Sequence, residues 1–101
     1  MPTVSDHADT RMRERCGLNS RASQRLVERA WEKGLKHSDL VGSIKRWADS
    51  LYFYAEKPDF EVRIYGDKTY IFAQQNLVTV LDLPNKYKST VKKLVEKHTN
   101  S

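Results

Sequence analysis

The chain has 101 residues, of which 39% are hydrophobic and 31% charged, a balance that fits one folded globular domain over residues 1–101 and excludes a disordered polymer. Its net charge of +5 is compatible with a polyanionic partner and equally with an ordinary solvated surface. The single cysteine excludes an internal disulfide framework. No apolar run approaches the ~20 residues needed to cross a bilayer, and we expect no secretory signal, so the predicted location is the cytoplasm, away from membranes.

Helical periodicity dominates the first half of the chain. The spacing of apolar residues predicts a first helix that ends at Gly17 and a second that ends at Gly34, since glycine is common just after a helix. A third predicted helix begins with Ser38 as its cap and ends before Pro58. We expect residues 1–4 to be frayed.

The hydrophobic period changes from 3.6 to 2 in the second half of the chain. Alternation predicts strands over residues 60–65, 69–73 and 77–83, and their short connections imply antiparallel neighbours. Residues 86–97 then have the pattern of a last helix. The expected fold class is therefore α+β, with N-terminal helices packed on one face of a three- to four-stranded antiparallel meander and a basic helix at the C-terminus.

The opposite face of such a sheet would be available to a ligand. If Val62 and Ile64 point into the core, Arg63 and Tyr65 point outward. For the second and third strands the alternation is ambiguous, and it leaves open whether Tyr70 and Phe72 or Ile71 and Ala73 share the face of Val62 and Ile64. Thr79 is the polar residue of an apolar third strand, which suits either a β-branched filler or a hydroxyl kept for a site.

The most informative chemistry lies at residues 7–15, His-Ala-Asp-Thr-Arg-Met-Arg-Glu-Arg. Because each helical residue turns by about 100°, His7, Arg11 and Arg15 fall on one stripe, with Glu14 at its edge. Cleavage of RNA at the 2′-hydroxyl needs a base, an acid and cations, which His, Arg and Tyr side chains supply without a metal. The strip together with Arg63 and Tyr65 is therefore a candidate catalytic group. The alternative is a set of surface ion pairs, with the arginines paired to Glu14 and Asp9.

Other chemistry is poorly supported. His7, His37 and His98 are far apart in the sequence and no spacing is typical of a zinc site, so we expect no metal and no cofactor. The last helix carries five lysines against Glu96, and this surface is either a solvated face or a nucleic-acid-binding surface that contacts phosphates. The lysines concerned are Lys86, Lys88, Lys92, Lys93 and Lys97.

The pattern His-Ala-x-x-Arg-Met-x-Glu-Arg resembles the opening of a set of small bacterial and phage proteins related to the BrnT-like and RelE-like RNA-cleaving toxins. The arginine-bearing strand at 62–65, the turn at 66–67 and the Leu-Val-Thr-Val-Leu strand at 77–81 resemble the same proteins, so that the likeness touches about a third of the chain. It implies a RelE-like architecture, metal-independent ribonuclease activity in a toxin or mobile-element system, and RNA and a cognate antitoxin as partners. By matching position, the residues implied to line the site are His7, Arg11, Arg15, Arg63 and Thr79.

The sequence departs from that pattern between Cys16 and Pro58, where two substantial helices replace a short segment and one modest helix. A second hypothesis is therefore a non-catalytic phage or mobile-element protein that binds nucleic acid or a host nucleoprotein, such as an anti-defence inhibitor. A third is a protein–protein module built on exposed aromatic residues such as Tyr52 and Tyr54.

Overall fold

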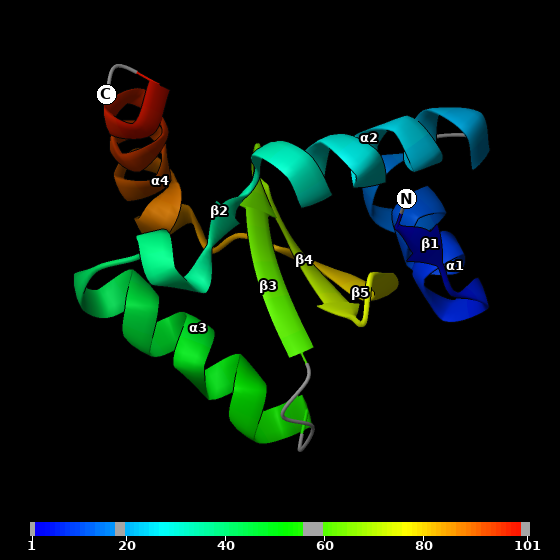
Figure 1. Cartoon of the computed structure of the whole chain (residues 1–101), viewed down its shortest axis with the longest axis horizontal. Coiled ribbons are helices and arrows are strands. Elements are labelled where there is room, and N and C mark those ends of the chain that lie inside the picture. Colours follow the sequence, from blue (N-terminus) through cyan, green and yellow to red (C-terminus); the bar gives the residue numbers. More distant parts are fainter. Residues whose placement is uncertain (1, 18–19, 56–59, 100–101) are drawn as a thin grey trace.

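The computed structural model describes residues 2–17, 20–55 and 60–99, and the structural statements that follow concern these ranges. Figure 1 shows the elements in chain order, with helices on either side of a twisted sheet. They are β1 (Thr3–Val4), α1 (Asp6–Cys16), α2 (Ser20–Lys33), β2 (Leu35–Lys36), a 3-10 turn (His37–Asp39), α3 (Gly42–Ala55), β3 (Phe60–Tyr65), β4 (Lys68–Ala73), β5 (Asn76–Asp82) and α4 (Asn85–Thr99).

The ends of the first two helices follow from local chemistry. The Ser5 hydroxyl accepts a hydrogen bond from the Ala8 N–H at 3.1 Å, and Gly17 closes α1 with a left-handed φ of 64°, as expected for glycine after a helix. After α2, the Gly34 N–H donates to the Ala30 carbonyl at 2.9 Å. A Cβ on Gly34 would lie 2.4 Å from that oxygen and 3.0 Å from Cβ of Arg63, so glycine allows α2 to end directly against β3.

The predicted antiparallel meander of β3, β4 and β5 is confirmed, but the sheet around it is mixed. The strand order is β1-β5-β4-β3-β2, and β1 runs parallel to β5, with the Thr3 N–H donating to the Gln75 carbonyl at 2.9 Å. The expectations of a frayed 1–4 segment and of a purely antiparallel sheet are therefore wrong for the described residues. Strands of two residues carry no periodicity, and their partners are distant in sequence.

The segment after α2 also differs from the expectation. Leu35–Lys36 forms β2 on the outer edge of β3, and the Lys36 N–H donates to the Asp39 carboxylate at 2.9 Å to close the 3-10 turn. The third helix starts at Gly42 rather than Ser38. The turn removes Leu40 from the helix, yet Leu40 stays buried at 1% exposure, which explains why it matched the apolar stripe.

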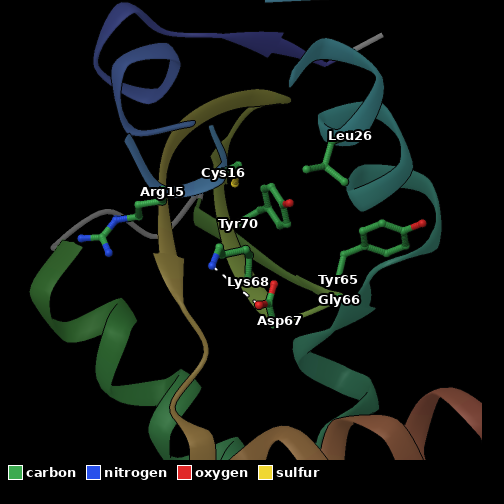
Figure 2. A pocket seen from close by; sticks show the side chains of 8 residues that line it. All are labelled: Arg15, Cys16, Leu26, Tyr65, Gly66, Asp67, Lys68 and Tyr70. Atoms are coloured by element: carbon green, nitrogen blue, oxygen red, sulfur yellow. Dashed lines mark ion pairs between the residues drawn. The ribbon is translucent and has the colours of Figure 1, made fainter. Parts of the chain in front are cut away.

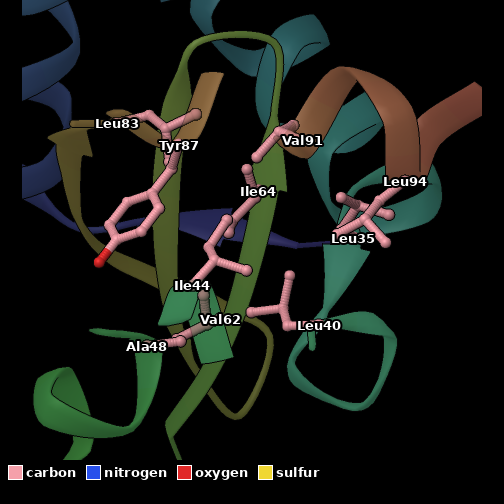
Figure 3. Close-up of a cluster of buried hydrophobic side chains, with 10 residues drawn as sticks. All are labelled: Leu35, Leu40, Ile44, Ala48, Val62, Ile64, Leu83, Tyr87, Val91 and Leu94. Atoms are coloured by element: carbon pink, nitrogen blue, oxygen red, sulfur yellow. The ribbon is translucent and has the colours of Figure 1, made fainter. Parts of the chain in front are cut away.

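Helices cover both faces of the sheet, whereas one covered face was expected. Four consecutive β4 residues, 69–72, are buried, which requires cover on both sides. Helices α1 and α2 pack on the face that carries Tyr70 and Phe72, while Val62 and Ile64 point to the other face, under α3 and α4. Figure 3 shows this second core. It consists of Leu35, Leu40, Ile44, Ala48, Val62, Ile64, Leu83, Tyr87, Val91 and Leu94.

The helices on the two faces of the sheet limit which of its side chains a ligand can reach. Helices cover both faces of the sheet at residues 62–64 of β3 and 69–72 of β4, so these side chains lie under a helix. In the described ranges, no helix is long and apolar enough to cross a membrane. The side chains of Tyr52 and Tyr54, proposed from sequence as a protein-binding surface, lie outside the described residues.

Candidate functional site

The strip on α1 forms ion pairs along the helix surface. His7 is exposed, Nη1 of Arg11 lies 3.7 Å from the Glu14 carboxylate, and Nη2 of Arg13 lies 3.2 Å from Asp9. Exposed pairs of this kind contribute little to stability. The carboxylates nevertheless neutralise part of the strip, so it is less cationic than the sequence alone indicates.

Arg63 is buried, and the expectation that it points outward is wrong. Its guanidinium carbon lies 4.5 Å from the Trp31 ring centroid, and its exposed fraction is 7%. Nε donates to the Trp31 carbonyl at 3.3 Å and Nη1 to the Val62 carbonyl at 3.2 Å. Because the Trp31 carbonyl belongs to the last turn of α2, Arg63 caps the negative end of that helix.

Thr79 faces the side of the sheet opposite to Arg63. In the strand register, Arg63 pairs with Tyr70 and Thr79 pairs with Ile71. Successive residues of a strand point to opposite faces, and Tyr70 packs under α1 and α2. Arg63 and Thr79 therefore cannot both face His7 on α1, and the structure does not bring these three candidates together.

Two of the sequence candidates, Arg15 and Tyr65, do share a pocket of about 340 Å³ between α1, α2 and the β3–β4 turn. Figure 2 shows the ring of Tyr70 beside Lys68, the ring of Tyr65 on the α2 side of the pocket, and the Arg15 guanidinium directed away from the other lining side chains. The remaining lining residues are Cys16, Leu26, Gly66 and Asp67.

Ion pairs hold the edge of this pocket together. The Asp82 carboxylate accepts from Nη1 of Arg15 and from Nζ of Lys68, each at 2.8 Å. The hydrogen bond to Asp82 raises the pKa of Lys68, and the same bond lowers the pKa of Asp82. Both groups are therefore charged at neutral pH, and Asp82 neutralises the cations that a phosphate would need.

Two further groups of the pocket, the Cys16 thiol and the Tyr70 phenol, stay protonated at neutral pH. Burial raises the pKa of the Cys16 thiol and raises the pKa of the Tyr70 phenol still further, because a low-dielectric environment disfavours the anion. A thiol with a raised pKa is a poor nucleophile at neutral pH. Within the described residues, no group of three or more His, Cys, Asp or Glu side chains is placed to hold a metal ion.

The lysines of α4 lie on two flanks of the helix. All five predicted nucleic-acid-binding lysines are exposed: Lys86, Lys88, Lys92, Lys93 and Lys97. Lys88 directly follows the buried Tyr87 and Lys86 directly precedes it, and at about 100° per residue they fall on opposite sides of the buried stripe. Lys92 lies four residues after Lys88 on the first flank, and Lys93 lies seven residues after Lys86 on the second.

A groove of about 560 Å³ runs along the first flank, between α4, the β3–β4 turn and the end of α2. Its apolar lining comes from Ile64, Tyr65, Val91 and Val95, and its charged lining from Lys33, Lys88, Lys92 and Glu96. Sequence reasoning missed Lys33, because only the packing of α2 and α4 against the same turn brings it beside the α4 lysines. We call this feature the α4 groove.

Comparisons of the chain with protein-family models, with curated proteins and with solved structures find no match. The relationship to RelE-like and BrnT-like toxins therefore stays a prediction. The class that fold and site define is a small α+β protein with a cationic, partly apolar groove.

Proposed function

We propose that this chain is a nucleic-acid-binding protein that uses the basic flanks of α4 and has no catalytic role of its own. The observation that carries the proposal is the set of six exposed lysines around the α4 groove and on the far flank of α4. A phosphate backbone is recognised by cations without demanding a particular side-chain geometry.

The pairing of charges separates these lysines from the cations of α1 and from Lys68. Arg11, Arg13, Arg15 and Lys68 are each paired with a carboxylate. In the part of the chain that the structure describes, no ion pair is formed by the six lysines. A phosphate can therefore bind these lysines without breaking an ion pair. The six are Lys33, Lys86, Lys88, Lys92, Lys93 and Lys97.

The proposal omits catalysis because the residues nominated for it are separated. Arg63 is committed to the Trp31 ring and to the end of α2, and Thr79 lies on the opposite face of the sheet. The role proposed for the chain is thus the capture of a nucleic acid or a host nucleoprotein, as a mobile-element protein with an anti-defence role would require.

Binding of a fluorescent oligonucleotide at increasing salt tests the proposal. We expect log Kd to rise linearly with log salt concentration, and the joint change Lys92→Gln with Lys93→Gln to reduce that slope by about 1.4 on single strands, since each phosphate contact contributes about 0.7. The matched control is Lys45→Gln with Arg46→Gln, two exposed cations of α3. Absence of binding, or an equal loss in the control, would refute the proposal.

Ribonuclease activity is a second candidate, favoured by one observation. Arg15 and Tyr65 line the same pocket as Lys68, so cationic and phenolic groups border one pocket, and catalysis by such groups needs no metal. The test is RNA incubated in EDTA with wild type, His7→Ala and Tyr65→Phe. If the protein is a ribonuclease of this kind, the wild type cleaves RNA and Tyr65→Phe loses most of the cleavage rate. Equal cleavage by the wild type and both variants would indicate a contaminant.

A further inference from the structure

We propose that the α4 groove receives an unstacked base, so that the protein prefers single-stranded nucleic acid over a duplex. This inference rests on the proposed nucleic-acid binding and adds the class of strand. It is carried by the combination, in one groove, of cations on two sides and an apolar floor between them.

The apolar floor is unnecessary for a protein that contacts phosphates alone. Ile64 and Val91 are buried at 1% and 4% exposure, whereas Val95 beside them is 44% exposed. Among the described residues, Val95 is one of two large hydrophobic side chains that are exposed, the other being Val41. Apolar surface left in water at a cationic groove favours a ligand with an apolar face of its own.

The charged side chains that line the groove indicate that the ligand also carries negative charge. Lys33, from the end of α2, lies on one side of the groove, and Lys88 and Lys92, from α4, lie on the other. Glu96 is the one carboxylate among the groove's lining residues. This excess of cations on both sides complements a chain of phosphates that crosses the groove with its bases turned inward.

The groove offers a base the apolar side chains of Ile64, Val91 and Val95, while the Tyr65 ring packs against the core under α1 and α2. Aromatic and apolar side chains bind single strands because every base has a flat apolar face, and one stacked base is worth roughly 1–3 kcal/mol. In a duplex the bases are already stacked on one another and paired, so their faces cannot reach the floor. A duplex would meet only the lysines.

The experiment compares one labelled strand of about 10 nucleotides, a length within the usual site sizes, with its duplex. Fluorescence polarisation gives Kd for wild type, Val95→Asn and Val41→Asn. Val95 lies in α4, where valine and asparagine have similar helix propensities, and Val41 directly precedes α3. The side chains of Val95 and Val41 are both exposed, so both variants keep the fold. We expect wild type to bind the single strand more tightly, and Val95→Asn to weaken that binding about 5-fold, within the range for one base contact, without changing duplex binding. Val41→Asn should change neither single-strand binding nor duplex binding.

The outcomes separate this inference from the proposed function. If wild type binds strand and duplex equally, or the duplex more tightly, the inference is overturned while nucleic-acid binding stands. If it binds neither, both proposals fail. Equal losses in Val95→Asn and Val41→Asn overturn the base-binding groove. Displacement of the strand by an equally charged poly-glutamate peptide at the same concentration also overturns it, because the groove would then recognise charge alone.

Discussion

Replacing Arg63 by alanine should destabilise the fold and leave nucleic-acid binding intact. The change removes a charged hydrogen bond to the Trp31 carbonyl at 3.3 Å and a guanidinium stacked 4.5 Å from the Trp31 ring. A hydrogen bond from a charged donor contributes about 1.5–3 kcal/mol, and a desolvated cation–π contact about 2 kcal/mol. Since one side chain makes both contacts and the hydrogen bond is long, we expect a loss of about 3 kcal/mol in the free energy of unfolding.

Urea unfolding followed by tryptophan fluorescence measures this loss, with Arg63→Lys as the matched variant. Lysine keeps the charge near the end of α2 but lacks the planar fork that stacks and donates together, so about half of the loss is expected. The ion pair with Glu61 spans 3.7 Å, and Glu61 is 49% exposed, so it adds little. A loss below about 1 kcal/mol in Arg63→Ala would refute the capping role. Nucleic-acid binding lost from a stably folded Arg63→Ala would return Arg63 to the functional site.

Three further predictions concern stability. Gly34→Ala should lower the free energy of unfolding by about 2 kcal/mol or more, since its Cβ would meet the Ala30 carbonyl at 2.4 Å and overpacking costs about 1–3 kcal/mol; a thermal melt that matches wild type would contradict this close approach. Thr69→Val should raise the free energy of unfolding by about 1 kcal/mol in urea, because the buried hydroxyl has no hydrogen-bond partner in the described structure and such a group costs about 1–3 kcal/mol; a destabilised variant would reveal a partner. Burial raises the pKa of Tyr70, so above pH about 10 the phenol ionises first in the unfolded state, and stability falls by up to about 1.4 kcal/mol per pH unit. Between pH 9 and 11, wild type should therefore lose more stability than Tyr70→Phe, and equal losses would show that the Tyr70 pKa is not raised.

The helices and the meander were predictable because their signals are local. Ser5 and Gly17 bound α1 through their own hydrogen bonds and φ angle, and the period-2 pattern predicted β3 to within a residue. β1 and β2 were not predictable, since two-residue strands exist only through the partners that they add to. The 3-10 turn after β2 was missed for a related reason, because a capping carboxylate from Asp39 competes there with helix formation.

The candidate site was likewise predictable in part, where its signals are local. The basic character of α4 and the stripe on α1 follow from helical spacing, which is a property of sequence alone. Whether these residues meet is decided by packing, because a side chain of a strand can point to either face and only the second layer of helices settles which one is buried. The tertiary structure therefore places Arg63 under α2, puts Thr79 on the opposite face, and brings Lys33 beside the α4 lysines. The sequence by itself determined the elements and their charges, and long-range contacts between elements distant in the chain decided which charges share a surface.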